Sequence, residues 1–384
     1  MAGIEIEIAQ GVASLPRDEW NALAGEGSPF LEWDWLASLE DSGAVGPGTG
    51  WEARPLVARR DGRLVAACPL YVKEHSEGEF VFDFAWADAA ERAGLPYYPK
   101  LLVGVPFTPV SGHRILTAAS EDREGLVRRF ADVLRETCLG NRLSSVHVNF
   151  CPPDEITGLE QGGFVRRIGL QYHWNNEGYA SFEDFLSRFR SKRRNQILRE
   201  RREVRASGVS IEILEGDAIP DDLFDPMFRI YLSTVRANPW GRQYLNRSFF
   251  SLLGERFRHR LCFVVARVGR EVIAGTLNVR KNAALYGRYW GALREVRYLH
   301  FELCYYTAVE HCIAEGLVRF EPGAGGDFKQ VRGFDAQPTW SAHFIADPRL
   351  ASAISRHLDA ERDQVERGIA WIREQSALKP GASR

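Results

Sequence analysis

Long apolar runs are absent from this 384-residue sequence, and so is an excess of charge of either sign. No stretch approaches the roughly 20 apolar residues that a membrane-spanning helix needs. The first ten residues, MAGIEIEIAQ, carry acidic side chains where a secretory signal carries basic ones. Lysine and arginine number 49 against 51 aspartates and glutamates, which argues against attraction of the whole protein to nucleic acid or anionic lipid. We expect a cytoplasmic protein without membrane insertion.

Paired cysteines and compact metal-binding motifs are also missing. The six cysteines are scattered without a C-x-x-C pair, a pattern typical of reduced, buried thiols rather than of a disulfide framework or a zinc centre. The sequence holds no H-E-x-x-H motif, no G-x-S-x-G elbow and no closely spaced set of His, Cys and Asp. We therefore predict no metal and no resident cofactor.

Two halves of the sequence carry the same order of predicted elements, and an apolar content of 45% is enough for a large core. In each half, paired strands precede a helix, and another strand follows the helix. This order predicts an α/β fold with mixed sheets and two related units. The elements fall at residues 55–73, 123–139 and 144–150 in the first half and at 261–291, 299–315 and 317–321 in the second.

The predicted domains are an N-terminal unit at 1–170, a C-terminal unit at 171–346, and a C-terminal helix and tail at 347–384. Residues 94–112 contain four prolines, so we expect them to form a structured, concave loop rather than one regular element. Within 349–374, apolar residues recur close to a 3.6-residue period, which predicts a helix docked on the core.

A basic helical segment is predicted at 181–207. It begins with a capping-box pattern, Ser181 followed by Asp184. Between Ser187 and Ala206, the sequence SRFRSKRRNQILRERREVRA carries nine basic residues against two acidic ones. A solvated charged helix is the simplest interpretation, but arginines four residues apart repel each other unless an anion compensates. Phosphate backbone is the leading candidate for that anion.

The stretch LYGRYWG at 285–291 is one candidate for the chemistry. Alternation along a strand places Tyr286, Arg288 and Trp290 on one face and Tyr289 on the other. An arginine beside two aromatic side chains is typical of a lined cleft, and a sheet edge with an outward-reaching arginine is the alternative.

The stretch FEPGAGGDFKQVRGF at 320–334 is the other candidate. Its glycines follow a predicted strand, and their backbone amides can form a small anion-binding concavity. The spacing excludes a dinucleotide fingerprint, and no Walker motif is present. Lys329 and Arg332 follow within six residues of Gly326, and such a lysine can stabilise the oxyanion that forms when an amine attacks a carbonyl. A surface lysine in a loop is the alternative. We assign structural roles to His300 and Glu302, which point in different directions at a helix start.

These stretches together resemble the FemAB-like family, often labelled peptidoglycan biosynthesis or recognition, within the acetyltransferase-like (GNAT) superfamily. The resemblance extends to about His343. It rests on residues 75–116, on FRSKRRNQILRERR, on LYGRYWG with LHFELCYYTAVEHCIAEGL, and on EPGAGGDFKQVRGF. It implies a tandem pair of GNAT-like units, which agrees with the duplicated order of elements.

The Fem transferases move an amino acid from aminoacyl-tRNA to the amine of a cell-wall precursor, and they share a Phe-Lys pair before a Gly-Phe pair. Phe328-Lys329 and Gly333-Phe334 resemble this feature, with one or two more residues between the pairs. The resemblance implies that Lys329 stabilises the transition state, and we add Tyr289 as a second catalytic candidate. Nearer relatives read GAQGEHK where this chain reads GAGGDFK, so we expect a changed donor or acceptor pocket.

The resulting expectation is an N-acyltransferase that uses aminoacyl-tRNA to modify an amine of a small-molecule or peptide-like acceptor. One alternative is an acyl-CoA-dependent enzyme, although the R/Q-x-x-G-x-G/A signature is missing; another is a non-catalytic protein that recognises a peptidoglycan precursor. The donor is a substrate rather than a cofactor, and tRNA or a phosphorylated precursor is the expected partner. The predicted substrate-binding residues are Tyr286, Arg288, Trp290, Gly323, Gly325, Gly326, Phe328 and Arg332, and the predicted anion-binding residues are Lys192, Arg193, Arg194, Arg201 and Arg202.

Overall fold

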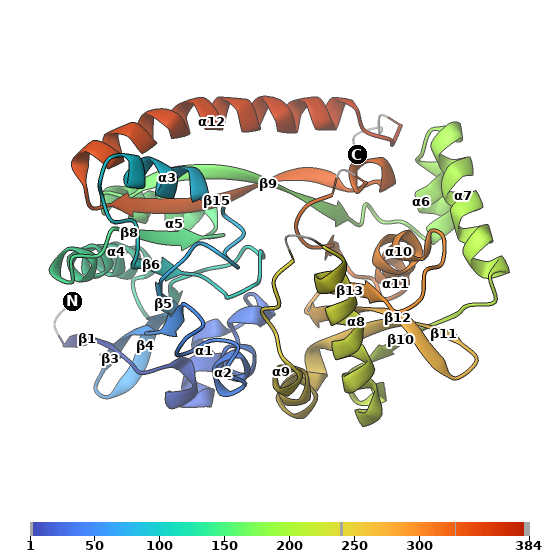
Figure 1. The fold of residues 1–384 in the computed structure, drawn as a ribbon, viewed down its shortest axis with the longest axis horizontal. Coiled ribbons are helices and arrows are strands. Elements are labelled where there is room, and N and C mark those ends of the chain that lie inside the picture. Colours follow the sequence, from blue (N-terminus) through green and yellow to red (C-terminus); the bar gives the residue numbers. More distant parts are fainter. Residues whose placement is uncertain (1–2, 239–240, 327, 380–384) are drawn as a thin grey trace. The chain divides into compact units, whose positions relative to one another are not determined.

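Two units make up the chain in the computed structural model, which describes residues 3–238, 241–326 and 328–379 (Figure 1). Unit 1 comprises residues 1–170 and 338–367, and unit 2 comprises residues 171–337 and 368–384. This division groups residues 338–367 with unit 1, and the domain bounds 1–170, 171–346 and 347–384 stay a prediction.

Unit 1 contains a small sheet in the order β1-β3-β4-β7 and a run of strands in the order β15-β8-β6-β5-β2. The hairpin predicted at Asp61-Gly62 joins β3 and β4, with Arg60 paired to Arg63. The elements are β1 (Ile4–Ile8), α1 (Arg17–Ala24), α2 (Trp33–Asp41), β2 (Trp51–Ala53), β3 (Leu56–Arg60), β4 (Arg63–Cys68), β5 (Leu70–Lys73), α3 (Phe84–Arg92), β6 (Lys100–Val103), β7 (Leu116–Thr117), α4 (Arg123–Gly140), β8 (Ser145–Asn149) and α5 (Pro153–Gln161).

The expectation of a concave loop at 94–112 is wrong for its centre. Residues Lys100–Val103 form β6, a fully buried strand between β5 and β8. The prolines flank this strand at positions 96, 99, 106 and 109, so the run between them keeps every amide that the sheet needs.

Unit 2 is built around strands in the order β10-β11-β12-β13-β14-β9. The predicted meander and the helix after it are confirmed. The elements, with those that continue into unit 1, are β9 (Val165–Asn175), α6 (Phe182–Ser187), α7 (Ser191–Ala206), β10 (Ser210–Glu215), α8 (Phe224–Ala237), α9 (Arg247–Leu252), β11 (Leu261–Val268), β12 (Glu271–Lys281), β13 (Ala284–Ala292), α10 (Leu299–Phe301), the π-helical turn η7 (Glu302–Thr307), α11 (Ala308–Ala314), β14 (Arg319–Glu321), β15 (Asp335–Ile345) and α12 (Pro348–Glu374).

The two units share one strand-pairing pattern, which confirms the predicted duplication. In unit 1, β5 pairs antiparallel with β6, and helix α4 leads to β8, which pairs parallel with β6. In unit 2, β12 pairs antiparallel with β13, and helices α10 to α11 lead to β14, which pairs parallel with β13. On its other side, β14 pairs with β9, the strand that crosses the boundary after residue 170. On its other side, β8 pairs with β15, which lies in the second half of the sequence. Each unit thus takes its last strand from the neighbouring half of the chain.

Helices cover both faces of the unit 2 strands (Figure 1). On one face, α8 packs so closely that a side chain at Gly291 would meet the carbonyl oxygen of Ile230. On the other face, Val204 of α7 and Leu303 of η7 share a buried cluster with Val264 of β11. The predicted capping box is also present, since the amide of Asp184 donates to the hydroxyl of Ser181 at 3.1 Å.

The predicted C-terminal helix is confirmed as α12. Its apolar residues Leu350, Ile354 and Leu358 are buried against Trp86 and Tyr97 within unit 1. Among the described residues, no helix combines the length and the apolar character needed to cross a membrane.

Helix α7 is anchored by ion pairs, which corrects the interpretation of Arg201. This side chain is 8% exposed, and its guanidinium lies 2.9 Å from a carboxylate oxygen of Glu302 and 2.5 Å from one of Glu310. Arg201 is therefore paired with carboxylates inside unit 2 and exposes little of its side chain, although it contributes to the lining of a hollow between α6 and α7. Glu302 keeps the structural role that the sequence assigned to it.

Unit 1 encloses a buried charge cluster around Lys100, which is fully buried. Its ammonium donates to Glu79 at 3.0 Å and to Asp83 at 2.5 Å. The hydroxyl of Tyr97 also donates to Asp83, at 2.6 Å. Burial alone lowers the pKa of Lys100, but the two carboxylates outweigh this effect and raise it overall. The strand β6 is therefore fixed by charge as well as by apolar packing.

We expect Arg201→Met to destabilise the protein by about 3–5 kcal/mol, because it leaves the buried Glu302 carboxylate without its cation. The matched substitution one residue later, Arg202→Met, removes an exposed cation and should change the unfolding free energy by less than about 0.5 kcal/mol. Urea denaturation of both variants measures the difference. Equal stabilities would contradict the assignment of Arg201 as an internal anchor.

Lys100→Met should likewise cost about 3–5 kcal/mol, since Glu79 and Asp83 would stay buried without the ammonium that contacts both of them. Lys192→Met, which alters an exposed lysine, is the matched control. Urea denaturation with an unchanged midpoint for Lys100→Met would show that the cluster does not stabilise unit 1.

Candidate functional site

A cavity of about 250 Å³ opens where the parallel strands β13 and β14 separate. Their pairing covers three residue pairs and ends at Tyr286 opposite Glu321. A Cβ atom at Gly287 would lie 3.2 Å from the backbone of Pro322, so the two strands approach each other closely where they begin to diverge. The residues that follow on each strand, from Gly287 to Trp290 and from Pro322 onward, then line the cavity.

A bulge in β13 corrects the predicted alternation of its side chains. The register with β12 shifts between Leu277, opposite Tyr289, and Asn278, opposite Gly287. Arg288 is thus the extra residue of the bulge, and Arg288, Tyr289 and Trp290 all line the cavity in succession. Strict alternation fails here because a bulge changes the direction of one side chain.

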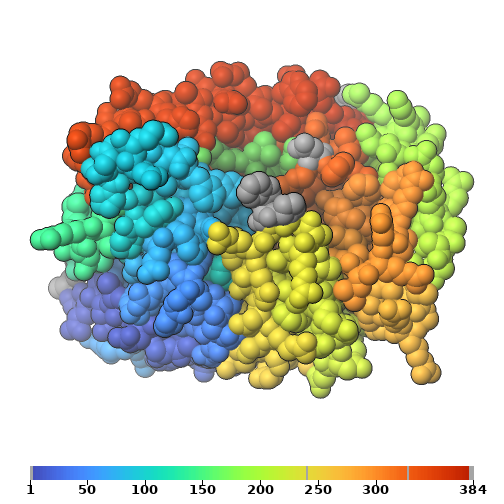
Figure 2. Space-filling model, viewed as in Figure 1, coloured from blue at the N-terminus to red at the C-terminus, as the bar shows by residue number. Residues whose placement is uncertain are grey.

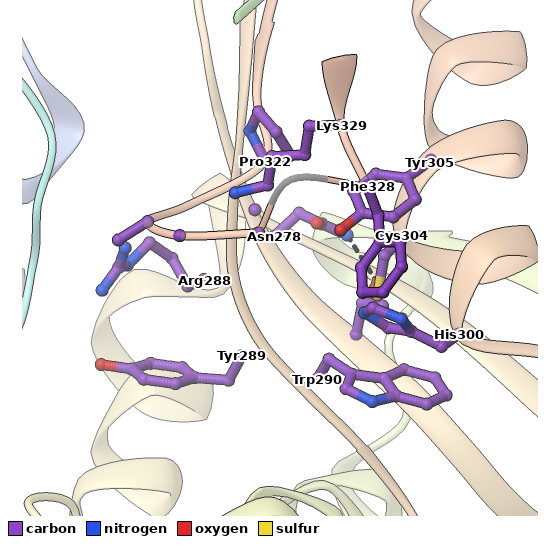
Figure 3. Close-up of a pocket in the computed structure, with 15 residues that line it drawn as sticks. Asn278, Arg288, Tyr289, Trp290, His300, Cys304, Tyr305, Pro322, Phe328 and Lys329 are labelled. Carbon is purple, nitrogen blue, oxygen red and sulfur yellow. Dashed lines mark hydrogen bonds between the residues drawn. The ribbon is translucent and has the colours of Figure 1, made fainter. Parts of the chain in front are cut away.

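Aromatic side chains form one wall of the cavity (Figure 3). The ring of His300 lies 5.1 Å from that of Trp290 and 5.5 Å from that of Tyr305. Burial lowers the pKa of His300 to about 4, and the nearby cations Arg332 and Lys329 contribute to this shift. His300 is consequently neutral at physiological pH and lines the cavity, although the sequence assigned it a structural role.

Lys329 contributes a buried ammonium group to the cavity. Its Nζ donates to the carbonyl oxygen of Gly323 at 2.5 Å. Burial lowers the pKa of Lys329 to about 8, while Cys304 acts in the opposite direction. The loop between β14 and Lys329 folds back with positive φ angles of 88° at Gly323 and 72° at Gly325, which glycine adopts without strain. A cation and a glycine-rich backbone therefore meet at one end of the cavity.

The structure brings most of the predicted site residues together. The cavity is lined by Arg288, Tyr289, Trp290, Gly325, Gly326, Phe328 and Lys329. Gly323 takes part through its carbonyl oxygen, whereas the hydroxyl of Tyr286 accepts a hydrogen bond from Arg319 at 3.1 Å and does not line the cavity.

Arg332 is placed differently from its prediction. Its guanidinium is buried, lies 3.0 Å from Glu200 of α7 and stacks on the ring of Phe301 at 3.5 Å. It also donates to the carbonyl oxygen of Phe328 at 3.0 Å. Arg332 thus joins the Lys329 loop to α7 and does not face the cavity.

Several lining residues were missed: Thr276 and Asn278 come from a strand that carries no motif, and the others lie inside the quoted stretches but were not predicted to line a site. Asn278 is one of them: its amide nitrogen donates to the backbone of Cys262 at 3.0 Å and to Thr276 at 2.9 Å. A polar side chain within an apolar strand was the available signal. The residues missed are Thr276, Asn278, Gly287, His300, Cys304, Tyr305, Pro322 and Ala324.

Glu321, the last residue of β14, is a buried acid next to this region. Burial raises its pKa to about 7, against the effect of Arg319 and Arg288. Its Oε2 atom lies 3.6 Å from Nε2 of His173. Glu321 does not line the cavity, and the charged side chains among its described lining residues are Arg288 and Lys329. With these cations, the cavity suits a ligand that carries or develops negative charge.

The outer side of α7 forms part of the surface of unit 2, coloured light green in Figure 2. Lys192 and Arg202 are exposed, and Arg193 and Arg194 are half-buried. A second hollow of about 310 Å³ lies between α6 and α7. Its lining includes Arg202 and Arg205 next to apolar side chains such as Leu198. Four of the five predicted anion-binding residues thus remain available to a partner.

Comparison with protein families gives one match, to the FemAB-like family described as peptidoglycan biosynthesis/recognition, over residues 11–380. A search of curated proteins found no match.

Among solved structures, FemX is similar over 89% of this chain and 98% of its own, with a TM-score of 0.55 and 12% identity. The C-terminal domain of a putative lysylphosphatidylglycerol synthetase from Agrobacterium fabrum matches over 89% and 95%, with a TM-score of 0.51 and 11% identity. A tandem GNAT protein from the clavulanic acid biosynthesis pathway matches over 90% and 99%, with a TM-score of 0.46 and 14% identity. The family match covers nearly the whole chain, and the protein belongs to the FemAB-like family of peptidoglycan biosynthesis/recognition proteins.

Proposed function

We propose that this protein is an N-acyltransferase that moves an aminoacyl group from aminoacyl-tRNA to an amine of a small-molecule or peptide-like acceptor. The observation that carries the proposal is the buried ammonium of Lys329, held by the carbonyl oxygen of Gly323 where β13 and β14 separate. Membership of the FemAB-like family supports the same reaction class.

In the proposed step, the acceptor nitrogen attacks the ester carbonyl carbon of the aminoacyl-tRNA. A carbon–nitrogen bond forms, and the carbon–oxygen bond to the terminal ribose breaks. The nitrogen loses a proton, and the ribose oxygen leaves as a hydroxyl group. The atoms therefore balance without an oxidant, a metal or a further co-reactant.

The role we assign to Lys329 is to stabilise the negative charge on the carbonyl oxygen during this attack. An ammonium that is already desolvated and positioned stabilises developing charge more strongly than one in water, because no solvent must reorganise. The pKa of about 8 keeps Lys329 mostly cationic at neutral pH.

The remaining lining residues suit the two substrates. Arg288 offers a planar cation to a carboxylate or phosphate oxygen, and we assign it to the acceptor or to the donor terminus. The rings of Trp290, Tyr305 and Phe328 offer apolar surface, on which a base or an amino-acid side chain can stack. Tyr289 stays a second catalytic candidate through its position in the lining.

Helix α7 is the proposed contact for the tRNA backbone. Its outward cations Lys192, Arg194 and Arg202 can bind phosphates, whereas Arg201 only holds the helix in place. Phosphate contacts of this kind release counterions, so affinity depends steeply on salt concentration.

Lys329→Met should lower kcat by about 10²–10³ in an assay with charged tRNA and a panel of amines. The exposed residue Lys379 provides the control variant Lys379→Met. Because only the protonated lysine stabilises an oxyanion, wild-type activity should fall as pH rises through about 8, and Lys329→Arg should abolish that fall because arginine stays charged.

Mass spectrometry of the product identifies the donor. Charged tRNA adds an aminoacyl group to the amine, whereas acyl-CoA adds an acyl group of different mass. Full activity of Lys329→Met, with an unchanged melting temperature, would overturn the assigned role. Absence of turnover with both donors would favour a recognition protein.

The salt dependence of tRNA binding tests α7. The triple variant Lys192→Gln, Arg194→Gln and Arg202→Gln should reduce the slope of log affinity against log salt by about 3, at about 1 per phosphate contact. A triple variant of unit 1, with glutamine in place of the exposed Arg128, Arg129 and Arg142, should leave the slope unchanged. Equal slopes for both triple variants would exclude α7 as the contact.

A further inference from the structure

A second group of chemically active side chains lies outside the cavity, where β10, β11 and α11 meet. Glu215 ends β10 and lies opposite Cys262 of β11 in the antiparallel register. His311 of α11 points its Nε2 atom at Oε1 of Glu215, at 2.9 Å. The oxygen, sulfur and nitrogen atoms of these three residues all lie within 4.8 Å of one another.

We propose that Glu215, Cys262 and His311 bind a Zn²⁺ ion, with water as the fourth ligand. Zinc bonds to such donors measure about 2.0–2.3 Å, so tetrahedral ligands stand roughly 3.3–3.8 Å apart. The observed donors lie within 4.8 Å of one another, and Nε2 of His311 is 2.9 Å from Oε1 of Glu215, so a bound ion requires side-chain rotations that bring all three to this spacing. A thiolate and an imidazole favour zinc over magnesium or calcium, which prefer oxygen ligands alone.

The burial of the three residues fits a site that is closed on one side and open on the other. Cys262 is fully buried in the sheet, whereas the side chains of Glu215 and His311 are 31% and 11% exposed. Zinc sites with three protein ligands keep the fourth position for water on such an open side.

Arg280 is the neighbouring cation, and its position is compatible with a bound metal. Its guanidinium lies 2.8 Å from Oε2 of Glu215 and 3.2 Å from Oε2 of Glu315. The metal uses the other oxygen of Glu215, Oε1, which faces His311. Arg280 then keeps both carboxylate contacts and orients Glu215 as an outer-shell partner. With Cys262 as a thiolate and Glu215 ionised, two negative charges balance the charge of Zn²⁺.

The same groups also form a hydrogen-bond network without a metal, since Nε2 of His311 pairs with Glu215. The two descriptions differ in a measurable way. A zinc site replaces the thiol proton by the metal, whereas the network keeps it.

The test is a titration of the metal-stripped full-length protein with Co²⁺, which takes tetrahedral zinc sites and gives a thiolate-to-cobalt charge-transfer band. We expect one equivalent to bind with this band and Zn²⁺ to displace it. Cys262→Ala should abolish the band, and His311→Gln should weaken the affinity at least about tenfold. The matched variants Cys138→Ala and His357→Gln, in unit 1, should bind as the wild type does.

Thermal melting adds an independent readout: one equivalent of Zn²⁺ should raise the melting temperature of the wild type, and Mg²⁺ should not. A wild type that binds no stoichiometric Co²⁺ would overturn the proposal, whatever the variants do. Retention of the charge-transfer band in Cys262→Ala would overturn it as well. Neither result bears on the transferase assignment, because the metal site shares no residue with the cavity.

Discussion

The short parallel pairing of β13 with β14 is the constraint on which the candidate site depends. Only three residue pairs hold the strands together before Gly287 and Pro322 separate. A longer pairing would close the cavity, and a side chain at position 287 would push Pro322 away. The divergence also gives the loop before Lys329 the room to fold back, so that its ammonium reaches the carbonyl oxygen of Gly323. The geometry of the site thus depends on the residue pair at which the parallel pairing of β13 with β14 ends.

Unit 1 contains a corresponding parallel strand pair, but the residues just beyond that pair have a different role. There β6 and β8 pair in parallel up to Val103 opposite Val148. Just beyond that pair, the fully buried Arg114 donates to the carbonyl oxygens of Asn149 at 2.7 Å and Val110 at 2.6 Å. A side chain with five donors is well suited to satisfy several carbonyl groups where strands part. The duplicated fold therefore places a buried arginine among backbone carbonyl groups in one unit and a buried lysine at the edge of a cavity in the other.

The sequence predicted the parts of the molecule that depend on local signals. The Asp61-Gly62 hairpin, the capping box at Ser181 and the glycine-rich loop before Lys329 follow from neighbouring residues alone. The bulge at Arg288, the burial of Arg201 and the lining role of His300 depend on partners many positions away, which no local pattern encodes. The same is true of Glu215, Cys262 and His311, because their donors meet only after three separate elements pack.

The basic helix shows why a charge count alone could not assign its function. Glu200 and Arg201 are adjacent in sequence, and both are buried in ion pairs, with Arg332 and with Glu302 respectively. These contacts fix the inner side of α7 against the helix that follows β13 and against the Lys329 loop. A helix held in this way is already ordered, so its backbone loses less conformational freedom when an anionic partner binds. Because Arg332 joins α7 to the Lys329 loop, the anchoring of the helix and the position of the lysine are parts of one packed arrangement.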